Sequence, residues 1–246
     1  MTAPSMRRLT AVELRKMTDT RSGRWLLIIV ALAAVAMVGV VIFAAKPGDR
    51  TLKEMFVASQ TGVAILLPIL GILAVTNEWS QRTTLTTFAL VPERHRVAGA
   101  KMFAGAVLAA AAVIVGGVTA VVGRALAGML GRADGGWTFP PSLIGTLVLA
   151  AAIGVLAGVA FGMIFMNSPL AIVLFILVPT GWTALGETVK AFNRPADWLD
   201  QNRTMNALYG TGMTGEEWAK VGTSTALWLL LPLITGVIRL ARRDLK

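Results

Sequence analysis

The chain has 246 residues, of which 55% are hydrophobic and only 15% are charged, and its mean hydropathy is +0.70. Because soluble domains have nearer a quarter of their residues charged, this composition excludes a soluble enzyme. The absence of cysteine excludes a disulfide-stapled secreted scaffold. The formal net charge of +10 would fit a nucleic-acid binder. In a chain this apolar, however, a basic excess is typical of cytoplasmic loops, and we expect no nucleic-acid partner.

Six stretches of the chain contain no Asp, Glu, Lys or Arg and are long enough to cross a bilayer, which needs about 20 apolar residues per helix. They are Trp25–Ala45, Val57–Val75, Met102–Val122, Leu143–Phe165, Leu170–Gly186 and Gly222–Ile238. We therefore predict an all-α polytopic membrane protein with six transmembrane helices. Residues 1–246 would form a single transmembrane domain, with an amino-terminal helix in 1–24, the bundle in 25–238 and a cytoplasmic tail in 239–246.

Positively charged residues indicate how the spans are oriented. With both termini in the cytoplasm, the cytoplasmic segments carry 14 Lys and Arg residues and the external segments carry 9. Lys and Arg near the ends of spans are enriched on the cytoplasmic side. We therefore predict a multi-pass protein with both termini cytoplasmic.

The residues before the first span favour an amphipathic helix. At about 100° per residue, four apolar residues share one side, namely Met6, Leu9, Leu14 and Met17. Glu13 and Thr10 interrupt this apolar side, and Arg8 and Arg15 lie opposite it. We predict an interfacial helix on the inner leaflet, with its basic residues at anionic headgroups. The alternative is a solvated basic tail that only enforces the topology.

Small residues in the fourth span predict a close helix contact. Gly154, Gly158 and Gly162 recur every four residues and share one face, which allows another helix to approach closely. The third span offers suitable partners in its alanine-rich stretch, including Ala109, Ala112, Gly116 and Ala120.

The external segment Glu187–Val221 is the longest between two spans. It has mixed charges together with Trp198, Tyr209 and Trp218, and tryptophan and tyrosine favour the membrane–water boundary. This composition suits short helices that dip back into the outer leaflet. A disordered external loop is the alternative.

Several kinds of chemistry are missing from the sequence. No G-x-x-x-x-G-K-[ST] loop occurs, so we expect no ATP site in this chain and no enzymatic activity of its own. The single histidine, His95, has neither a cysteine nor a second histidine with which to bind a metal ion, so we expect no metal site. Because no span contains an ionisable residue, we expect no proton or sodium relay across the bilayer. Transport would therefore have to be powered from outside the membrane domain.

The segment between the second and third spans, Thr76–Lys101, is the most informative part of the chain. It predicts a short amphipathic element that ends at Pro92 and is followed by a basic turn. Glu78 would begin this element, where the helix dipole favours a negative charge, and Arg82 is placed for an i,i+4 ion pair with it. Such an element lies parallel to the membrane and offers a ridge to a cytoplasmic partner.

This segment resembles the membrane subunits of type-2 ABC exporters. Members of that family have an acidic residue after the second span, a small residue and threonine, an apolar stretch, a proline, a basic residue and a lysine that opens the third span. The matching residues, in order, are Glu78, Thr83, Leu85, Leu90, Pro92, Arg94 and Lys101, and Arg82 stands where many members have glycine. The run Glu13-Leu14-Arg15-Lys16 is similar to the family's amino-terminal helix.

The resemblance implies the permease subunit of an ATP-driven exporter in a bacterial cytoplasmic membrane. Two such subunits, identical or related, would pack side by side, and two separate ATPase subunits would bind ATP and magnesium beneath them. The matched residues would form a coupling helix, Asn77–Pro92, seated on the ATPase, and Asn167 and Ser168 would make a second contact. Substrate would pass along the second and fifth spans, whose polar candidates are Gln60, Thr61, Thr180 and Thr183. An uncharged pathway suits an amphiphile such as a drug, an antibiotic or a lipid.

A protein of another class would share many of these features. A non-transporting anchor or assembly protein, whose basic inner face recruits a cytoplasmic partner, accounts for the spans and the charge bias equally well. It does not account for the pattern from Glu78 to Lys101. Copurification with an ATPase would distinguish the two hypotheses.

Overall fold

The computed structural model describes residues 5–80 and 94–242, and within those ranges every regular element is a helix. Six helical stretches there are long and apolar enough to cross a membrane, which confirms the predicted number of spans. The spans are α2 (Arg21–Ala44), the consecutive pair α3 (Leu52–Ser59) and α4 (Thr61–Ser80), α6 (Arg94–Met129), α7 (Ser142–Phe165), α8 (Ser168–Thr188), and a last span made of α11 (Gly215–Thr225), the π-helical turn η2 (Ala226–Leu230) and α12 (Leu231–Arg242).

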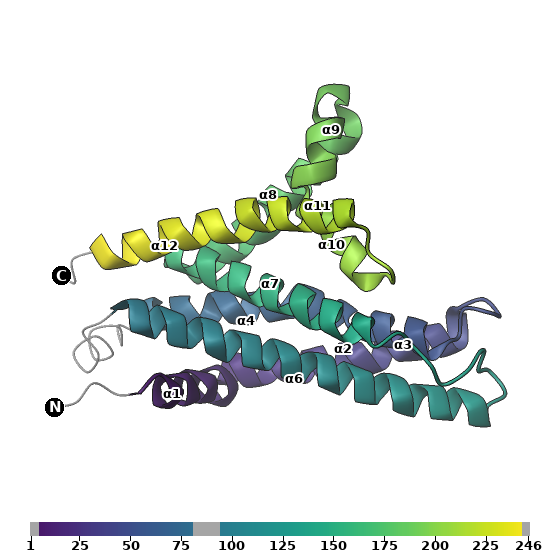
Figure 1. The fold of residues 1–246 in the computed structure, drawn as a ribbon. Helices are drawn as coiled ribbons and strands as arrows, with labels where there is room; N and C mark the ends of the chain where they lie inside the picture. The colour runs from purple at the N-terminus through teal and green to yellow at the C-terminus, as the bar shows by residue number, and fades with distance from the viewer. Residues whose placement is uncertain (1–4, 81–93, 243–246) are drawn as a thin grey trace.

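The spans are arranged around a central pair, α4 and α7. In Figure 1, α2 and α6 lie on one side of this pair, and α12 and α8 lie on the other. The helix α1 (Met6–Asp19) lies at the end of the bundle where α7 turns into α8 and where α12 ends. We call this the α1 end, and the opposite end, where α2 connects to α3 and α6 to α7, the distal end. An even number of spans places both chain ends on the same side.

The amino-terminal segment forms a helix, as predicted, and its apolar side packs on the protein. Met17 and Glu13 are the buried residues of α1, and Leu9 and Leu14 contact the two apolar clusters formed by the spans. Arg15 is exposed. The apolar stripe that the sequence assigned to the membrane therefore meets α6, α2 and α4.

The glycine face of the fourth span packs against α4, so the expectation that it meets the alanine-rich third span was wrong. A methyl group on Gly158 would collide with the backbone of Pro68, and one on Gly162 would lie 2.9 Å from the carbonyl oxygen of Ile72. Gly71 of α4 faces the backbone of Val155 in the same way. Glycines on both helices thus let the backbones of α4 and α7 touch, which no larger residue would permit.

Helices also form in the segment between α8 and α11. They are α9 (Lys190–Leu199), α10 (Gln201–Asn206) and the short 3-10 turn η1 (Ala207–Tyr209). Leu208 of η1 is fully buried in an apolar cluster with Ala150 and Ile153 of α7. The α10–η1 part of the segment therefore folds back from the distal end against the body of the bundle.

Candidate functional site

Four charged side chains from three helices form a closed ring at the α1 end. Glu13 and Lys16 come from α1, Glu78 from the end of α4, and Lys101 from the second turn of α6. The Nζ of Lys101 lies 2.6 Å from Oε2 of Glu13 and 3.0 Å from Oε1 of Glu78. The Nζ of Lys16 lies 2.7 Å from Oε1 of Glu13 and 2.8 Å from Oε1 of Glu78. We call these four residues the charge ring.

The charge ring is largely shielded from solvent and is electrically balanced. The side chains of Lys101 and Glu13 are 5% and 6% exposed, and that of Glu78 is 12% exposed. Lys101 donates its remaining hydrogen bond to the carbonyl oxygen of Ala74, at 2.8 Å, so all three of its ammonium donors have partners. Two carboxylates and two ammonium groups leave no net charge, which makes burial of this set tolerable.

Lys16 is the partly exposed member of the ring and sits outside the spans. Burial disfavours its ammonium form, but the hydrogen bonds and charges of Glu13 and Glu78 outweigh burial and raise the pKa of Lys16 above its ordinary value of 10.5. Lys16 therefore stays charged throughout the physiological pH range.

The ring joins α1 to both ends of the segment in which the sequence places the coupling helix. Glu78 lies in the last turn of α4 and Lys101 follows the start of α6, so the two flank residues 81–93. The coupling candidates Arg82, Thr83, Leu85 and Pro92 lie outside the described residues, as does the predicted pairing of Glu78 with Arg82. Arg94 is the first residue of α6. The partners that the structure describes for Glu78 are Lys16 and Lys101.

The second predicted contact, Asn167 and Ser168, lies at the same end of the bundle. Asn167 caps α8, because its side chain accepts a hydrogen bond from the backbone N–H of Leu170. The hydroxyl of Ser168 donates to Oγ1 of Thr76 at 2.7 Å, two residues before Glu78. The turn between α7 and α8 is therefore tied to the same part of α4 as the charge ring.

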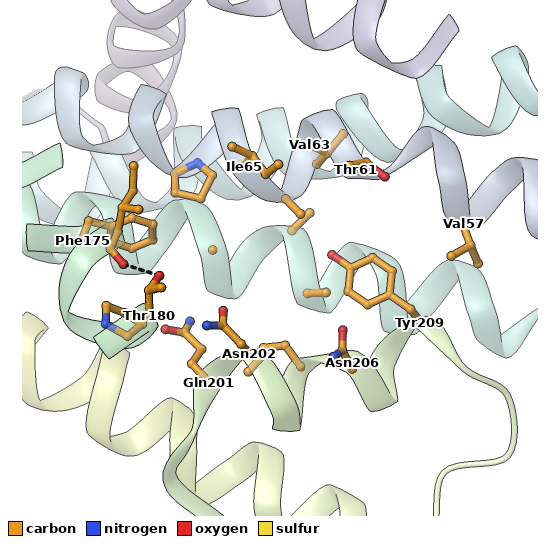
Figure 2. A pocket seen from close by; sticks show the side chains of 18 of the residues that line it. Val57, Thr61, Val63, Ile65, Phe175, Thr180, Gln201, Asn202, Asn206 and Tyr209 are labelled. Carbon is orange, nitrogen blue, oxygen red and sulfur yellow. Dashed lines mark hydrogen bonds between the residues drawn. The ribbon is translucent and has the colours of Figure 1, made fainter. Parts of the chain in front are cut away.

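A pocket of about 740 Å³ lies between α3, α4, α7, α8 and α10. Figure 2 shows Ile65, Val63 and Phe175 on its apolar walls and Tyr209 reaching into it from η1. Its polar lining consists of hydroxyl and amide groups, from Thr61, Thr180, Gln201, Asn202, Asn206 and Tyr209. None of its lining residues, all of which lie in the described ranges, is charged. Burial raises the pKa of Tyr209 above its ordinary value of 10.0, so this phenol stays neutral.

Two of the four predicted pathway residues line this pocket. Thr61 and Thr180 face it from α4 and α8. Thr183 lies just beyond it, donating to Oδ1 of Asp200 at 3.1 Å and accepting from the amide of Asn202 at 3.0 Å. The prediction for Gln60 does not match the structure, since this side chain is 2% exposed and turns the other way, toward Gly116 of α6.

The sequence analysis missed the contribution of α10 to the pocket. The segment between α8 and α11 contains Gln201, Asn202 and Asn206. Nothing in the spacing of these residues indicates that they pack against the spans. It also missed the role of Glu13, which interrupts the apolar side of α1 because that position faces Lys101. Lys101, near the start of the third span, was the feature of the sequence that could have indicated a buried partner for Glu13.

Comparison with known proteins adds no family to this description. No protein-family model matches the chain, and no curated protein matches it. Among the described residues, no group of three or more His, Asp or Glu side chains is close enough together to hold a metal ion. Arguments about function therefore rest on the charge ring, the pocket and the sequence motif.

Proposed function

We propose that this chain is the permease subunit of an ATP-driven exporter of the type-2 ABC class. The observation that carries the proposal is the charge ring, which binds the helix α1 to both flanks of residues 81–93. The motif from Glu78 to Lys101 assigns that segment to coupling, and two of its matched residues are members of the ring.

The charge ring has the properties expected of a part that transmits force. A buried ion network contributes little net stability compared with an apolar core of the same size, but it fixes the positions of its members, because separating one leaves the others unpaired. Motion imposed on residues 81–93 by a cytoplasmic subunit would thus reach α1, α4 and α6 together. The link from Ser168 to Thr76 extends the same rigid region to the turn before α8.

The uncharged pocket supports an amphiphilic substrate. Its walls are mostly apolar, and its polar groups are neutral hydroxyls and amides that can donate and accept hydrogen bonds. A small ion would find no opposite charge there, whereas a drug, an antibiotic or a lipid with a neutral polar group would find both kinds of contact. With no charged residue in the pocket, the driving force would come from two ATPase subunits that bind ATP and magnesium.

In this proposal two permease subunits, identical or related, pack side by side in the cytoplasmic membrane of a bacterium, with both termini in the cytoplasm. The test is copurification of the chain with the ATPase encoded beside it, followed by ATPase assays of the complex in liposomes. Hydrolysis by the complex that rises with an amphiphilic substrate, together with transport of that substrate, is the expected result. A chain that binds no ATPase, or binds one without any substrate-dependent hydrolysis, would instead be an anchor or assembly protein.

A further inference from the structure

Two basic side chains on α9 form no ion pair with any acidic residue that the structure describes. At about 100° per residue, α9 has a polar side made of Lys190, Asn193, Arg194 and Asp197. Asp197 binds Arg203 at 3.1 Å. Neither Lys190 nor Arg194 makes an ion pair within the part of the chain that the structure describes. Two adjacent positive charges are therefore left outside any ion pair.

These two cations line a hollow of about 500 Å³ beside the first turns of α9. The other lining residues are Glu187, Ala191 and Asn193. Asn193 is held in place because its amide donates to the carbonyl oxygen of Gly186 at 3.3 Å. Two cations and the carboxylate of Glu187 leave a single positive charge in the hollow, which matches the single negative charge of a phosphodiester.

The hollow lies at the membrane surface at the distal end. The span α8 starts at the α1 end and finishes at Thr188, so the residues that follow it are at the opposite surface. The helix α9 folds back beside the last turns of α8, with the rings of Phe192 and Trp182 5.9 Å apart, and Figure 1 shows the two helices projecting from the bundle. Lys190 and Arg194 are separated by about 6 Å along α9, which keeps both within the headgroup layer.

The other side of α9 is suited to the acyl chains below that layer. It carries Phe192, which is 39% exposed, whereas Trp198 lies nearer the polar side, with the Nζ of Lys220 5.7 Å from the centre of its ring. Aromatic side chains favour the membrane–water boundary, and amphipathic helices bury their apolar side just beneath the headgroups while basic residues meet anionic lipids. Both sides of α9 thus fit one occupant, the lipid at this surface.

We propose that Lys190 and Arg194 bind the phosphate of an anionic phospholipid in the leaflet at the distal end, with Phe192 inserted beneath its headgroup. In the predicted topology this is the outer leaflet. Lipid binding at this hollow goes beyond the proposed function and holds whether or not the chain transports a substrate.

The contribution of the two basic side chains to lipid binding is tested with the full chain in nanodiscs. The nanodiscs contain about three parts of phosphatidylcholine to one part of phosphatidylglycerol. After transfer to detergent, mass spectrometry measures how much of each lipid stays bound. The parent should retain phosphatidylglycerol preferentially, and Lys190→Gln with Arg194→Gln should weaken its binding about fivefold for each cation removed. The matched control, Lys46→Gln with Lys53→Gln, removes the same charge from the α2–α3 connection at the same end and should leave retention unchanged. Equal losses in both variants, or no preference in the parent, would overturn the proposal.

The apolar side is tested with single cysteines, which the parent sequence lacks. A fluorescent label on Phe192→Cys should be quenched by lipids brominated in their acyl chains, and the same label on Asn193→Cys should be quenched much less. A second copy of the chain covering α9 would protect the label at position 192 and would allow two Phe192→Cys chains to form a disulfide. Either of those observations would contradict a lipid at this site.

Discussion

Glu13 and Lys101 are 88 residues apart in the sequence, and their side chains meet at 2.6 Å in a site that is almost closed to solvent. The contact ties the amino-terminal helix to the start of the third span. Lys101 also contacts Glu78, so one ammonium group holds α1, α4 and α6 in register. The stability and the coupling of this end of the bundle should both depend on it.

Substitution of Lys101 should destabilise the protein strongly. Lys101→Met leaves only Lys16 to offset the two carboxylates of Glu13 and Glu78, and removing one partner of a buried ion pair costs about 3–5 kcal/mol. Thermal melting in detergent should show a marked fall. The control Lys53→Met removes an exposed lysine whose pair with Glu54 is 3.5 Å long, and pairs of this kind contribute about 0–1 kcal/mol. Similar melting temperatures for the two variants would mean that the ring is not intact in the membrane.

Combining substitutions in the ring should show coupling. Glu13→Gln and Lys101→Met each leave an unpaired buried charge, whereas the double variant loses one charge of each sign and keeps the balance of the ring. The double variant should therefore be less destabilised than the sum of the single variants. Strict additivity of the three free-energy changes would show that the two side chains do not interact.

Glu78→Gln tests whether the ring transmits force. The change keeps the size of the side chain but removes the charge that faces Lys16 and Lys101. If the ring couples residues 81–93 to the spans, transport in liposomes should fall about tenfold, equivalent to about 1.4 kcal/mol, while ATP hydrolysis by the complex continues. Glu54→Gln, in the first turn of α3 at the distal end, serves as the control. Transport and hydrolysis that fall together would show a loss of assembly rather than of coupling.

The close contact between α4 and α7 should tolerate no added methyl group. In Gly158→Ala the new side chain meets the backbone of Pro68, and overpacking of this kind costs about 1–3 kcal/mol. Gly145→Ala is the matched control, because it lies on the same helix with no atom within 4 Å of the added carbon. Alanine favours helix over glycine, so the control should melt at the parent's temperature or higher. Equal melting of both variants would show that the helices separate in the membrane.

Adjacent residues at the start of α4 should behave differently. Thr61→Val removes a hydroxyl from the pocket. The concentration of substrate needed to stimulate the ATPase should rise, because the substrate loses about one hydrogen bond, or about 0.5–1.5 kcal/mol of binding free energy. Gln60→Leu changes a side chain that faces α6 and should alter the melting temperature without changing that concentration. The opposite pattern would place the substrate on the α6 side of the helix.

The topology can be tested because the chain has no cysteine of its own. Ser5→Cys and Asp49→Cys place single thiols at exposed positions at the α1 end and in the α2–α3 connection. An impermeant maleimide added to intact cells should label only the second. Labelling of the first alone would reverse the orientation and place the charge ring outside.

The number of spans could be predicted from the sequence, because a bilayer imposes one requirement on every crossing helix. Their limits could not, since α6 runs from Arg94 to Met129 where the sequence predicted Met102–Val122. Each helix needs about 20 apolar residues and must satisfy its own backbone hydrogen bonds. Both conditions are local and can be recognised without knowing which helices are neighbours. The amphipathic character of α1 and the small-residue face of α7 were visible for the same reason, since helical periodicity alone determines which residues share a side.

The partners of these surfaces depend on tertiary structure. Glu13 interrupts an apolar stripe in the sequence, and only the position of α6 shows that Lys101 lies opposite it. Gly154, Gly158 and Gly162 predict a close neighbour but fit α4 and α6 equally well until Pro68 and Ile72 of α4 are found against them. Gln60, the one residue between α3 and α4, points toward α6, whereas the adjacent Thr61 points into the pocket. Periodicity describes one helix at a time, and the charge ring and the pocket exist only where several helices meet.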